Sequence, residues 1–257
     1  MKQIKALLYS ILEMLTRGRG IAKHINGADL RLPAKYFRYF PSNYEADNFE
    51  FLKASVKPGS VVLDIGAHIG LFSVIAAKYM QQKGKVFAFE PTQNTYLLLE
   101  QTIAMNVLHE VIFPVKEAMS KETGTITFYV SENEADNSNS LISYKQDRQL
   151  EGIEVSVDTI DNFASEQGLR AIDFIKIDVE GAEFDTLRGG TTIFKTHRPH
   201  CILAIHPEPI AKKGDQLADI YDYIQQLKYS IIFNGQPISK SDFCANTALI
   251  DLHLYPL

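Results

Sequence analysis

Residues 61–70 read VVLDIGAHIG, a short apolar run that ends in Asp64 and a turn that contains Gly66 and Gly70. A second apolar run ends in Glu90, and a helical pattern lies between the two runs. Further apolar runs follow at 111–115, 174–178, 201–205, 230–233 and 247–254. Continuous apolar strands that alternate with helices are typical of a parallel sheet covered on both faces. The pattern therefore predicts one doubly wound α/β domain.

The alternation of apolar strands with helices is interrupted in two places. Residues 125–130 and 153–157 alternate between polar and apolar, which predicts an inserted pair of surface or edge strands. Near the N-terminus, Ile4, Leu7, Leu8, Ile11, Leu12 and Leu15 have helical spacing. We expect this helix to pack on the rest of the chain or on a partner subunit. The chain is thus divided into a helical extension at 1–43 and a main domain at 44–257.

Composition excludes several classes of protein. The chain has 257 residues, of which 46% are hydrophobic, enough for a sizeable core. Its net charge is -5 and it has no basic stripe, so we expect no nucleic-acid partner. Two cysteines give no disulfide framework and no metal knuckle, which is typical of a cytoplasmic location. No apolar run is long enough to predict a transmembrane segment.

The glycine turn distinguishes between cofactors. A dinucleotide-binding turn would have GxGxxG, but His68 occupies the place of the second glycine. Asp64 puts a negative charge beside the turn, where it would repel phosphate and attract the cationic methionine part of S-adenosyl-L-methionine. Glu90 can accept hydrogen bonds from ribose hydroxyls. The pattern predicts a cofactor site made by Asp64, Gly66, Ala67, His68, Gly70 and Glu90.

Two alternatives accompany this interpretation. Gly66 is needed so that the cofactor can approach closely, because a side chain there would occupy that space. Alternatively, Gly66 and Gly70 simply form a tight turn. Asp64 contacts the cofactor, or it caps the helix that follows.

Three blocks of the sequence resemble signature blocks of the FkbM-type methyltransferases. They are VVLDIGAHIG at 61–70, AFEP at 88–91 and IDFIKIDVEGAE at 172–183, and VDTID at 157–161 also matches. The resemblance extends from Tyr44 to the C-terminus. It implies a class I methyltransferase fold, with seven strands in the order 3-2-1-4-5-7-6 and the last strand antiparallel. It also implies S-adenosyl-L-methionine as methyl donor and a hydroxyl acceptor on a sugar, glycan or secondary metabolite.

The chain departs from the family's pattern at two positions. His68 stands where family members often have Asn, and Ala204 stands where many have an acid, just before Ile205 and His206. An acid that assists catalysis in those relatives is therefore absent here. Glu208, a few residues further along, is a candidate replacement.

Candidate catalytic residues follow the fourth and fifth strands of the predicted sheet. An alcohol acceptor must lose a proton, and Asp178 is the first candidate by position, with His206 second and Glu180 third. Lys176 lies on the same strand face as Asp178, so we expect it to pair with Asp178, Glu180 or Glu183. The alternative is a structural ion-pair cluster. The same acids and His206 could bind a divalent ion, but the ligand spacing is not dense, and we predict no metal site.

Other segments provide weaker candidates. Glu117 and Ala118 follow the third strand, where the adenine ring lies in the fold that the resemblance implies. The backbone there contacts the adenine edge, or Glu117 is simply exposed to solvent. Tyr44 and Glu45 precede the first strand where the chain folds over the site, and Glu45 is a candidate for cofactor or acceptor contact. The polar residues 131–140 form either a lid over the acceptor or a surface excursion.

We therefore predict an S-adenosyl-L-methionine-dependent O-methyltransferase with a small-molecule or glycan acceptor. One alternative is a catalytically silent S-adenosyl-L-methionine-binding module, which the absent acid at Ala204 and the N-terminal helix keep open. A nucleotide-dependent dehydrogenase is the other, although the missing central glycine argues against it.

Overall fold

The computed structural model describes residues 9, 14–16, 18–131 and 150–257. Most of the expected N-terminal helix and nearly all of the polar loop at 131–140 lie outside the described residues. Across the part of the chain that is described, no helix has both the length and the apolar character needed to cross a bilayer.

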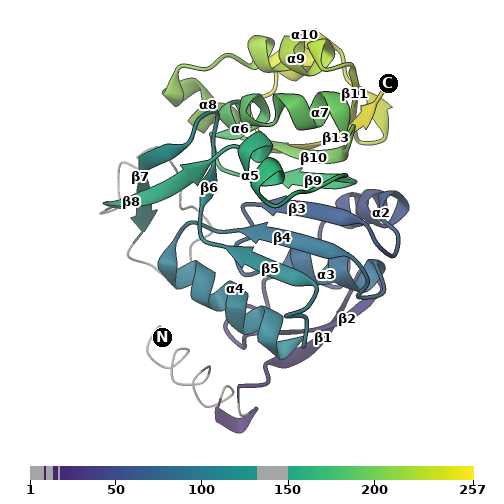
Figure 1. The fold of residues 1–257 in the computed structure, drawn as a ribbon, viewed down its shortest axis with the longest axis vertical. Helices are drawn as coiled ribbons and strands as arrows, with labels where there is room; N and C mark the ends of the chain where they lie inside the picture. The colour runs from purple at the N-terminus through teal and green to yellow at the C-terminus, as the bar shows by residue number, and fades with distance from the viewer. Residues whose placement is uncertain (1–8, 10–13, 17, 132–149) are drawn as a thin grey trace.

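A central sheet of eight strands dominates the fold (Figure 1), in the order β12-β11-β13-β10-β9-β3-β4-β5. In chain order the strands are β3 (Val61–Ile65), β4 (Lys85–Phe89), β5 (Ile112–Val115), β9 (Phe174–Ile177), β10 (His200–Ile205), β11 (Tyr229–Phe233), β12 (Gln236–Pro237) and β13 (Ile250–Pro256). Strands β5, β4, β3, β9 and β10 run parallel, and β13 runs antiparallel to both β10 and β11. The expected count of seven strands is wrong, because a tight turn at Asn234 and Gly235 sends the chain back along β11 as β12.

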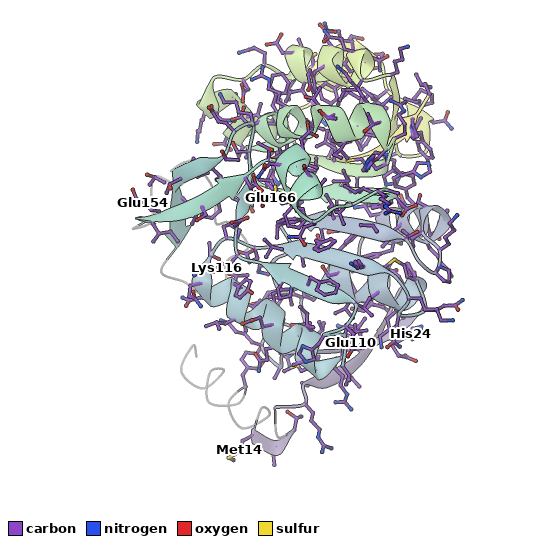
Figure 2. All side chains as sticks on the ribbon, viewed as in Figure 1. Met14, His24, Glu110, Lys116, Glu154 and Glu166 are labelled. Carbon is purple, nitrogen blue, oxygen red and sulfur yellow. The ribbon has the colours of Figure 1, made fainter. Side chains whose placement is uncertain are left out.

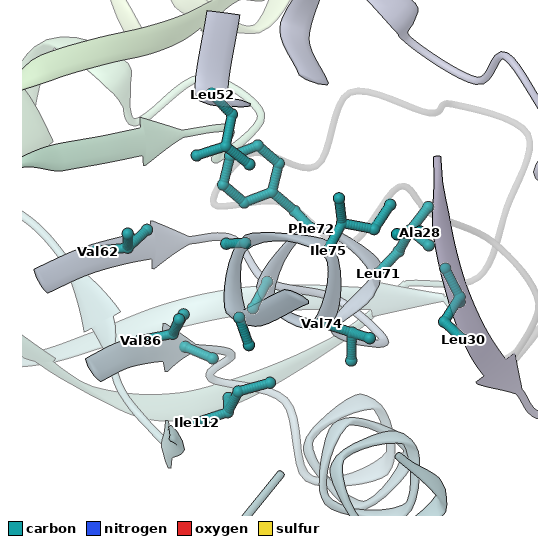
Figure 3. Packing of buried hydrophobic residues seen from close by; sticks show 14 of the residues in the cluster. Ala28, Leu30, Leu52, Val62, Leu71, Phe72, Val74, Ile75, Val86 and Ile112 are labelled. Atoms are coloured by element: carbon teal, nitrogen blue, oxygen red, sulfur yellow. The ribbon is translucent and has the colours of Figure 1, made fainter. Parts of the chain in front are cut away.

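Each face of the sheet packs on its own helices, because successive residues of a strand point to opposite faces. On one face Val62, Val86 and Ile112 pack against the first set of helices (Figure 3). That set is α2 (Ala46–Ser55), α3 (Leu71–Tyr79) and α4 (Gln93–Met105). On the other face Leu63 and Ile175 pack against the second set. That set is α5 (Ile160–Glu166), α6 (Glu183–Gly189), α7 (Thr191–Thr196), α8 (Pro207–Lys213), α9 (Leu217–Gln226) and α10 (Lys240–Cys244).

The N-terminal extension contains a β-hairpin. β1 (Ile21–Ile25) and β2 (Ala28–Leu32) pair antiparallel around Asn26 and Gly27, which both have positive φ angles. β2 buries every second residue in the same hydrophobic cluster as α3 and α4. The expectation of a helical extension is therefore wrong for this segment, because an Asn-Gly pair favours the two-residue turn of a hairpin.

A second, three-stranded sheet lies beside the main one (Figure 1). β7 (Gly124–Ser131) and β8 (Leu150–Asp158) pair antiparallel and correspond to the predicted inserted strands. β8 also pairs with the short strand β6 (Ala118–Met119), which follows β5 closely. Val155 is buried, whereas its neighbour Glu154, labelled in Figure 2, is exposed. Polar and apolar residues alternate here because successive side chains of the strand point to opposite faces of the sheet.

Candidate active site

A cavity of about 270 Å³ opens beyond the carboxyl ends of β3, β4 and β9. β3 and β9 are neighbours, but the chain continues from β3 to α3 on one face and from β9 to α6 on the other. Such a divergence leaves room for a ligand above the strand ends. Most residues that we predicted from the sequence line this cavity: Gly66, Ala67, His68, Glu90, Glu117, Ala118, Asp178, Glu180 and His206. Asp64 and Gly70 do not line it.

The turn after β3 is held by the strands on both sides of it. The backbone amides of Gly66 and Ala67 donate to the carbonyl oxygen of Phe89 at 3.1 and 2.9 Å. Gly66 has a φ angle of 84°, and a Cβ atom at this position would overlap the carbonyl oxygen of Asp178. We had expected the cofactor to require this glycine, but the backbone that follows β9 requires it already in the protein alone.

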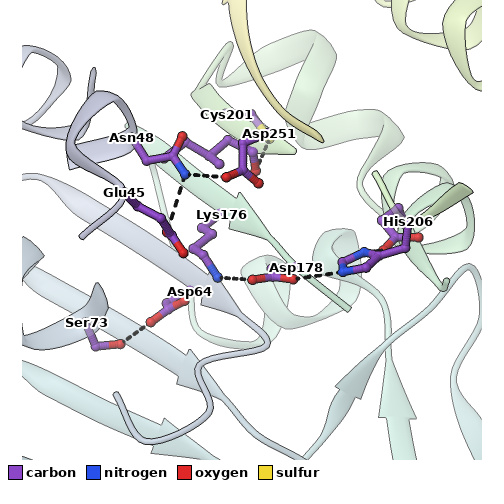
Figure 4. A network of polar contacts seen from close by, with 11 residues as sticks. Glu45, Asn48, Asp64, Ser73, Lys176, Asp178, Cys201, His206 and Asp251 are labelled. Atoms are coloured by element: carbon purple, nitrogen blue, oxygen red, sulfur yellow. Dashed lines mark hydrogen bonds and ion pairs between the residues drawn. The ribbon is translucent and has the colours of Figure 1, made fainter. Parts of the chain in front are cut away.

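Asp64 is fully buried beneath the turn. Its Oδ2 accepts a hydrogen bond from Ser73 at 2.5 Å, and its Oδ1 has no partner among the described atoms (Figure 4). Burial raises the pKa of this carboxyl, and the nearby charge of Lys176 opposes the increase. Asp64 does not cap α3, since Gly70 is the N-cap residue of that helix. Because a buried oxygen without a partner is costly, Asp64 is suited to receive a donor from a ligand.

Glu90 and His68 lie on the side of the cavity next to β4. Thr92 donates to Glu90 Oε1 from its backbone amide at 3.1 Å and from its hydroxyl at 2.6 Å. These bonds fix the carboxylate, and burial raises its pKa. The His68 ring contacts Tyr36 edge-on, with 5.7 Å between the ring centroids. Burial and then the charge of Lys176 lower the pKa of His68 to about 4, so this ring is neutral at neutral pH.

Four side chains make successive polar contacts along the opposite side, and Figure 4 labels three of them, Lys176, Asp178 and His206. Lys176 Nζ donates to Asp178 Oδ2 at 2.9 Å. The other oxygen of Asp178 lies 3.8 Å from His206 Nε2. On its far side, His206 Nδ1 lies 2.7 Å from Oε1 of Glu183, which is fully buried. We predicted that Lys176 pairs with Asp178, Glu180 or Glu183, and the structure shows its ion pair with Asp178.

Among these four contacting side chains, the pKa shifts distinguish an ion pair from a titrating histidine. Burial would lower the pKa of Lys176, but Asp178 and two further carboxylates raise it above its ordinary range. Burial would raise the pKa of Asp178, but Lys176 and then His206 lower it overall. Burial would also lower the pKa of His206, but its bond to Glu183 and the charge of that residue raise it overall. Lys176 and Asp178 therefore form an ion pair that stays charged at neutral pH. Of these groups, His206 is the one that titrates nearest to neutral pH.

Two further acids line the cavity where we predicted them. Glu180 follows β9 in a left-handed backbone conformation, with a φ angle of 46°. Glu117 lies between β5 and β6, and burial together with the charges of Asp158 and Glu166 raises its pKa. Within the ranges that the structure describes, no three His, Cys, Asp or Glu side chains are grouped to hold a metal ion.

The residues before α2 also reach the cavity. Tyr44 and Glu45 both line it, and Glu45 is the N-cap residue of α2. Burial and the nearby carboxylate of Glu45 raise the pKa of Tyr44. Asn48, one turn further into α2, donates to Glu45 Oε2 at 3.4 Å. This segment therefore closes the wall of the cavity next to Lys176.

A carboxylate that we did not predict lies opposite the position of the absent acid. Asp251 on β13 is the register partner of Ala204 on β10. Asn48 donates to Asp251 Oδ2 at 2.8 Å, which connects α2 to the last strand. The candidate replacement Glu208 lies instead on α8, where it is exposed and pairs with Lys212 at 2.7 Å. Asp251 is thus the carboxylate paired across the strands with Ala204.

A ligand cavity lies at the switch point of this mostly parallel sheet, with Asp64 near the end of β3 and Glu90 directly after β4, and the fold is class I methyltransferase-like. The chain belongs to the FkbM methyltransferase family, because the model of the methyltransferase FkbM domain matches residues 64–231. The fold resembles the crystal structure of a methyltransferase FkbM from Methylobacillus flagellatus, with a TM-score of 0.52 and 16% identity. That alignment covers 78% of this chain and 44% of the other.

Two curated relatives have names that specify the methylated atom. The chain is 33% identical over 156 residues to the 2-O-methyltransferase NoeI of Sinorhizobium fredii, covering 54% of this chain and 61% of that protein. It is 30% identical over 163 residues to the 31-O-demethyl-FK506 methyltransferase FkbM of Streptomyces tacrolimicus, covering 52% and 60%. The matched part thus spans about three fifths of the length of these relatives.

The family and the fold identify S-adenosyl-L-methionine as the cofactor. The residues present fit such a group. Asp64 Oδ1 is buried without a partner, as a site for an amine or hydroxyl donor requires, and Thr92 holds the Glu90 carboxylate at the cavity wall. A carboxylate is a suitable acceptor for ribose hydroxyls.

We expect Glu90→Ala to weaken S-adenosyl-L-methionine binding by about 1–3 kcal/mol, because the hydroxyl groups of the ligand would then be buried without an acceptor. Isothermal titration calorimetry measures this loss. Glu110→Ala is the matched control, since Glu110, labelled in Figure 2, is exposed, lies before the start of β5 and does not line the cavity. Unchanged affinity in a folded Glu90→Ala variant would remove Glu90 from the cofactor site.

Proposed function

We propose that the protein is an S-adenosyl-L-methionine-dependent O-methyltransferase that acts on a hydroxyl group of a sugar, glycan or secondary metabolite. The observation that carries this proposal is the His206 ring, which lines the cavity between Asp178 and the buried Glu183. A hydroxyl group holds its proton tightly near neutral pH, so its methylation requires a nearby base. The names of the two O-methyltransferase relatives support the same chemistry.

His206 is the proposed proton acceptor. When bound, S-adenosyl-L-methionine would supply a methyl group on a positively charged sulfur, and the carbon–sulfur bond would break with its electron pair going to the sulfur of a neutral thioether. His206 Nε2 takes the proton of the acceptor hydroxyl as the new oxygen–carbon bond forms. The ionised Asp178, 3.8 Å away, stabilises the positive charge that the imidazole gains. Position alone favours Asp178 as the base, but its lowered pKa and its bond to Lys176 make it the weaker base of the two.

The remaining predicted residues have roles in binding. Glu180 and Glu45 are proposed to accept hydrogen bonds from the methyl acceptor, because both line the cavity near Lys176 and Asp178. We propose cofactor contacts at the cavity-lining residues Gly66, Ala67, His68, Glu90, Glu117 and Ala118, and at the unpartnered Oδ1 of Asp64 beneath the turn. Gly70, which we also predicted, does not line the cavity and is the N-cap residue of α3. The proposed role of residues 131–140 as a lid concerns residues that are almost all outside the described part of the chain.

Incubation with methyl-labelled S-adenosyl-L-methionine and fractionated glycans and metabolites tests the proposal. We expect the label to move to a hydroxyl-bearing compound, and we expect a chelator to leave the rate unchanged because the proposal gives the proton to His206 and no role to a metal ion. Cofactor binding without transfer to any fraction would favour the alternative, a silent S-adenosyl-L-methionine-binding module. Loss of transfer in the presence of a chelator would instead assign the activation of the hydroxyl to a metal ion.

A further inference from the structure

We infer that Glu183 is a positioning residue, which orients the His206 ring and fixes the tautomer that leaves Nε2 free toward the cavity. This inference rests on the proposed function, in which His206 accepts the proton. The sequence pattern predicts for Glu183 only membership of an ion-pair cluster or a position in the first turn of a helix. The structure instead brings its carboxylate to 2.7 Å from His206 Nδ1.

The Glu183 carboxylate is held on two sides. The backbone amide of Gly181 lies 3.0 Å from both of its oxygens. This contact is possible because Glu180 and Gly181 have φ angles of 46° and 109°, which turn the amide of Gly181 back toward α6. The carboxylate is fully buried, so water does not replace either partner. A group fixed in this way can hold the imidazole in one orientation.

The chemistry of the contact determines the tautomer. An ionised carboxylate only accepts hydrogen bonds, so the short contact requires a hydrogen on His206 Nδ1. A neutral imidazole has one N–H group, and Nε2 is then left as the basic nitrogen. Nε2 is also the nitrogen that faces Asp178. Glu183 therefore presents the correct nitrogen to an acceptor hydroxyl in the cavity.

Several charged groups surround His206. Glu183 contacts it from α6, Asp178 and Glu180 face it from the segment after β9, and Asp251 acts from β13. These acids favour the protonated ring, and burial opposes them with a smaller net effect. Since the protonated ring cannot accept a proton, we expect kcat/KM to rise with pH through a midpoint above the ordinary histidine value of about 6.5.

The experiment combines ¹⁵N NMR of histidine-labelled protein with the pH profile of kcat/KM. At a pH above the midpoint of His206, we expect the wild-type ring to be neutral with its hydrogen on Nδ1. The His206→Gln variant assigns the signal. Glu183→Gln keeps an oxygen that can accept from Gly181 and from Nδ1 but removes the charge. In this variant, we expect the midpoint of the His206 titration by NMR and the midpoint of the kcat/KM profile to fall together by about one pH unit or more. The KM for the acceptor should be unchanged. Asp185→Asn is the charge-matched control, because Asp185 lies in the same turn but bonds to Lys213.

Two results would overturn the inference. One is a neutral wild-type ring with its hydrogen on Nε2, a measurement that needs no variant and so does not depend on whether Glu183→Gln folds. The other is a folded Glu183→Gln variant with the midpoint of the wild type. Both NMR readouts are made without an acceptor, so they stand even if no fraction is methylated and the proposed function fails.

Discussion

His206→Gln is expected to bind S-adenosyl-L-methionine as the wild type does and to turn over about 10²–10⁴-fold more slowly. Glutamine has an amide that can donate to the buried Glu183, so the substitution does not leave that carboxylate without a partner. It has no basic nitrogen, however, and cannot take the proton of a hydroxyl group. Calorimetry measures the binding of the cofactor, and single-turnover kinetics with a labelled methyl group measures the chemical step.

The matched control for this variant is His24→Gln. His24 lies on the hairpin with a side chain that is 62% exposed, bonded to Asp29 and remote from the cavity. We expect its turnover to equal that of the wild type. If Asp178→Asn abolishes turnover while His206→Gln retains it, Asp178 is the base and His206 only shapes the segment after β10.

Gly66→Ala is expected to destabilise the folded protein by about 2–6 kcal/mol. Two effects combine at this position. The positive φ angle of 84° is costly for a residue with a Cβ atom, and that atom would overlap the carbonyl oxygen of Asp178. The strand end after β9 would have to move, and it carries the ion pair with Lys176. Urea unfolding followed by circular dichroism measures the free energy of unfolding.

Gly59→Ala separates these two effects. Gly59 has a φ angle of 98°, but no atom lies within 4 Å of a Cβ atom built there. Its substitution should therefore cost only the backbone strain, about 1–3 kcal/mol. Equal losses in the two variants would show that the overlap with Asp178 is relieved without cost.

The sheet and much of the cavity could be predicted because their signals are local. Apolar runs that end in an acid, such as those before Asp64 and Glu90, predict buried parallel strands and bring their carboxyl ends to one edge. The hairpin also has a local signal, Asn26 and Gly27 between alternating residues, but the expectation of a helical extension rests on the helical spacing before it and does not use this signal. The extra strand β12 has the same kind of local signal, because an Asn-Gly pair at 234–235 makes the turn that precedes it.

The ion pair of Lys176 with Asp178 is local and could be predicted, but the polar contacts between residues that are distant in the sequence could not. Asn48 and Asp251 are 203 positions apart and meet only through the antiparallel register of the last strand. Glu183 and His206 are 23 positions apart, on an α6 turn and after β10, and a pattern of acids does not show which of them faces the ring. The close approach of Gly66 to Asp178 likewise depends on the packing of two strands.

The central claim is that the methyl group is transferred to a hydroxyl oxygen with His206 as the proton acceptor. The most direct measurement uses S-adenosyl-L-methionine with a ¹³C-labelled methyl group and determines by NMR which atom of the purified product carries the label. We predict a methyl ether that the wild type forms and His206→Gln forms at least about 10²-fold more slowly. A label on nitrogen, sulfur or carbon, formed at the same rate by both proteins, would contradict the claim.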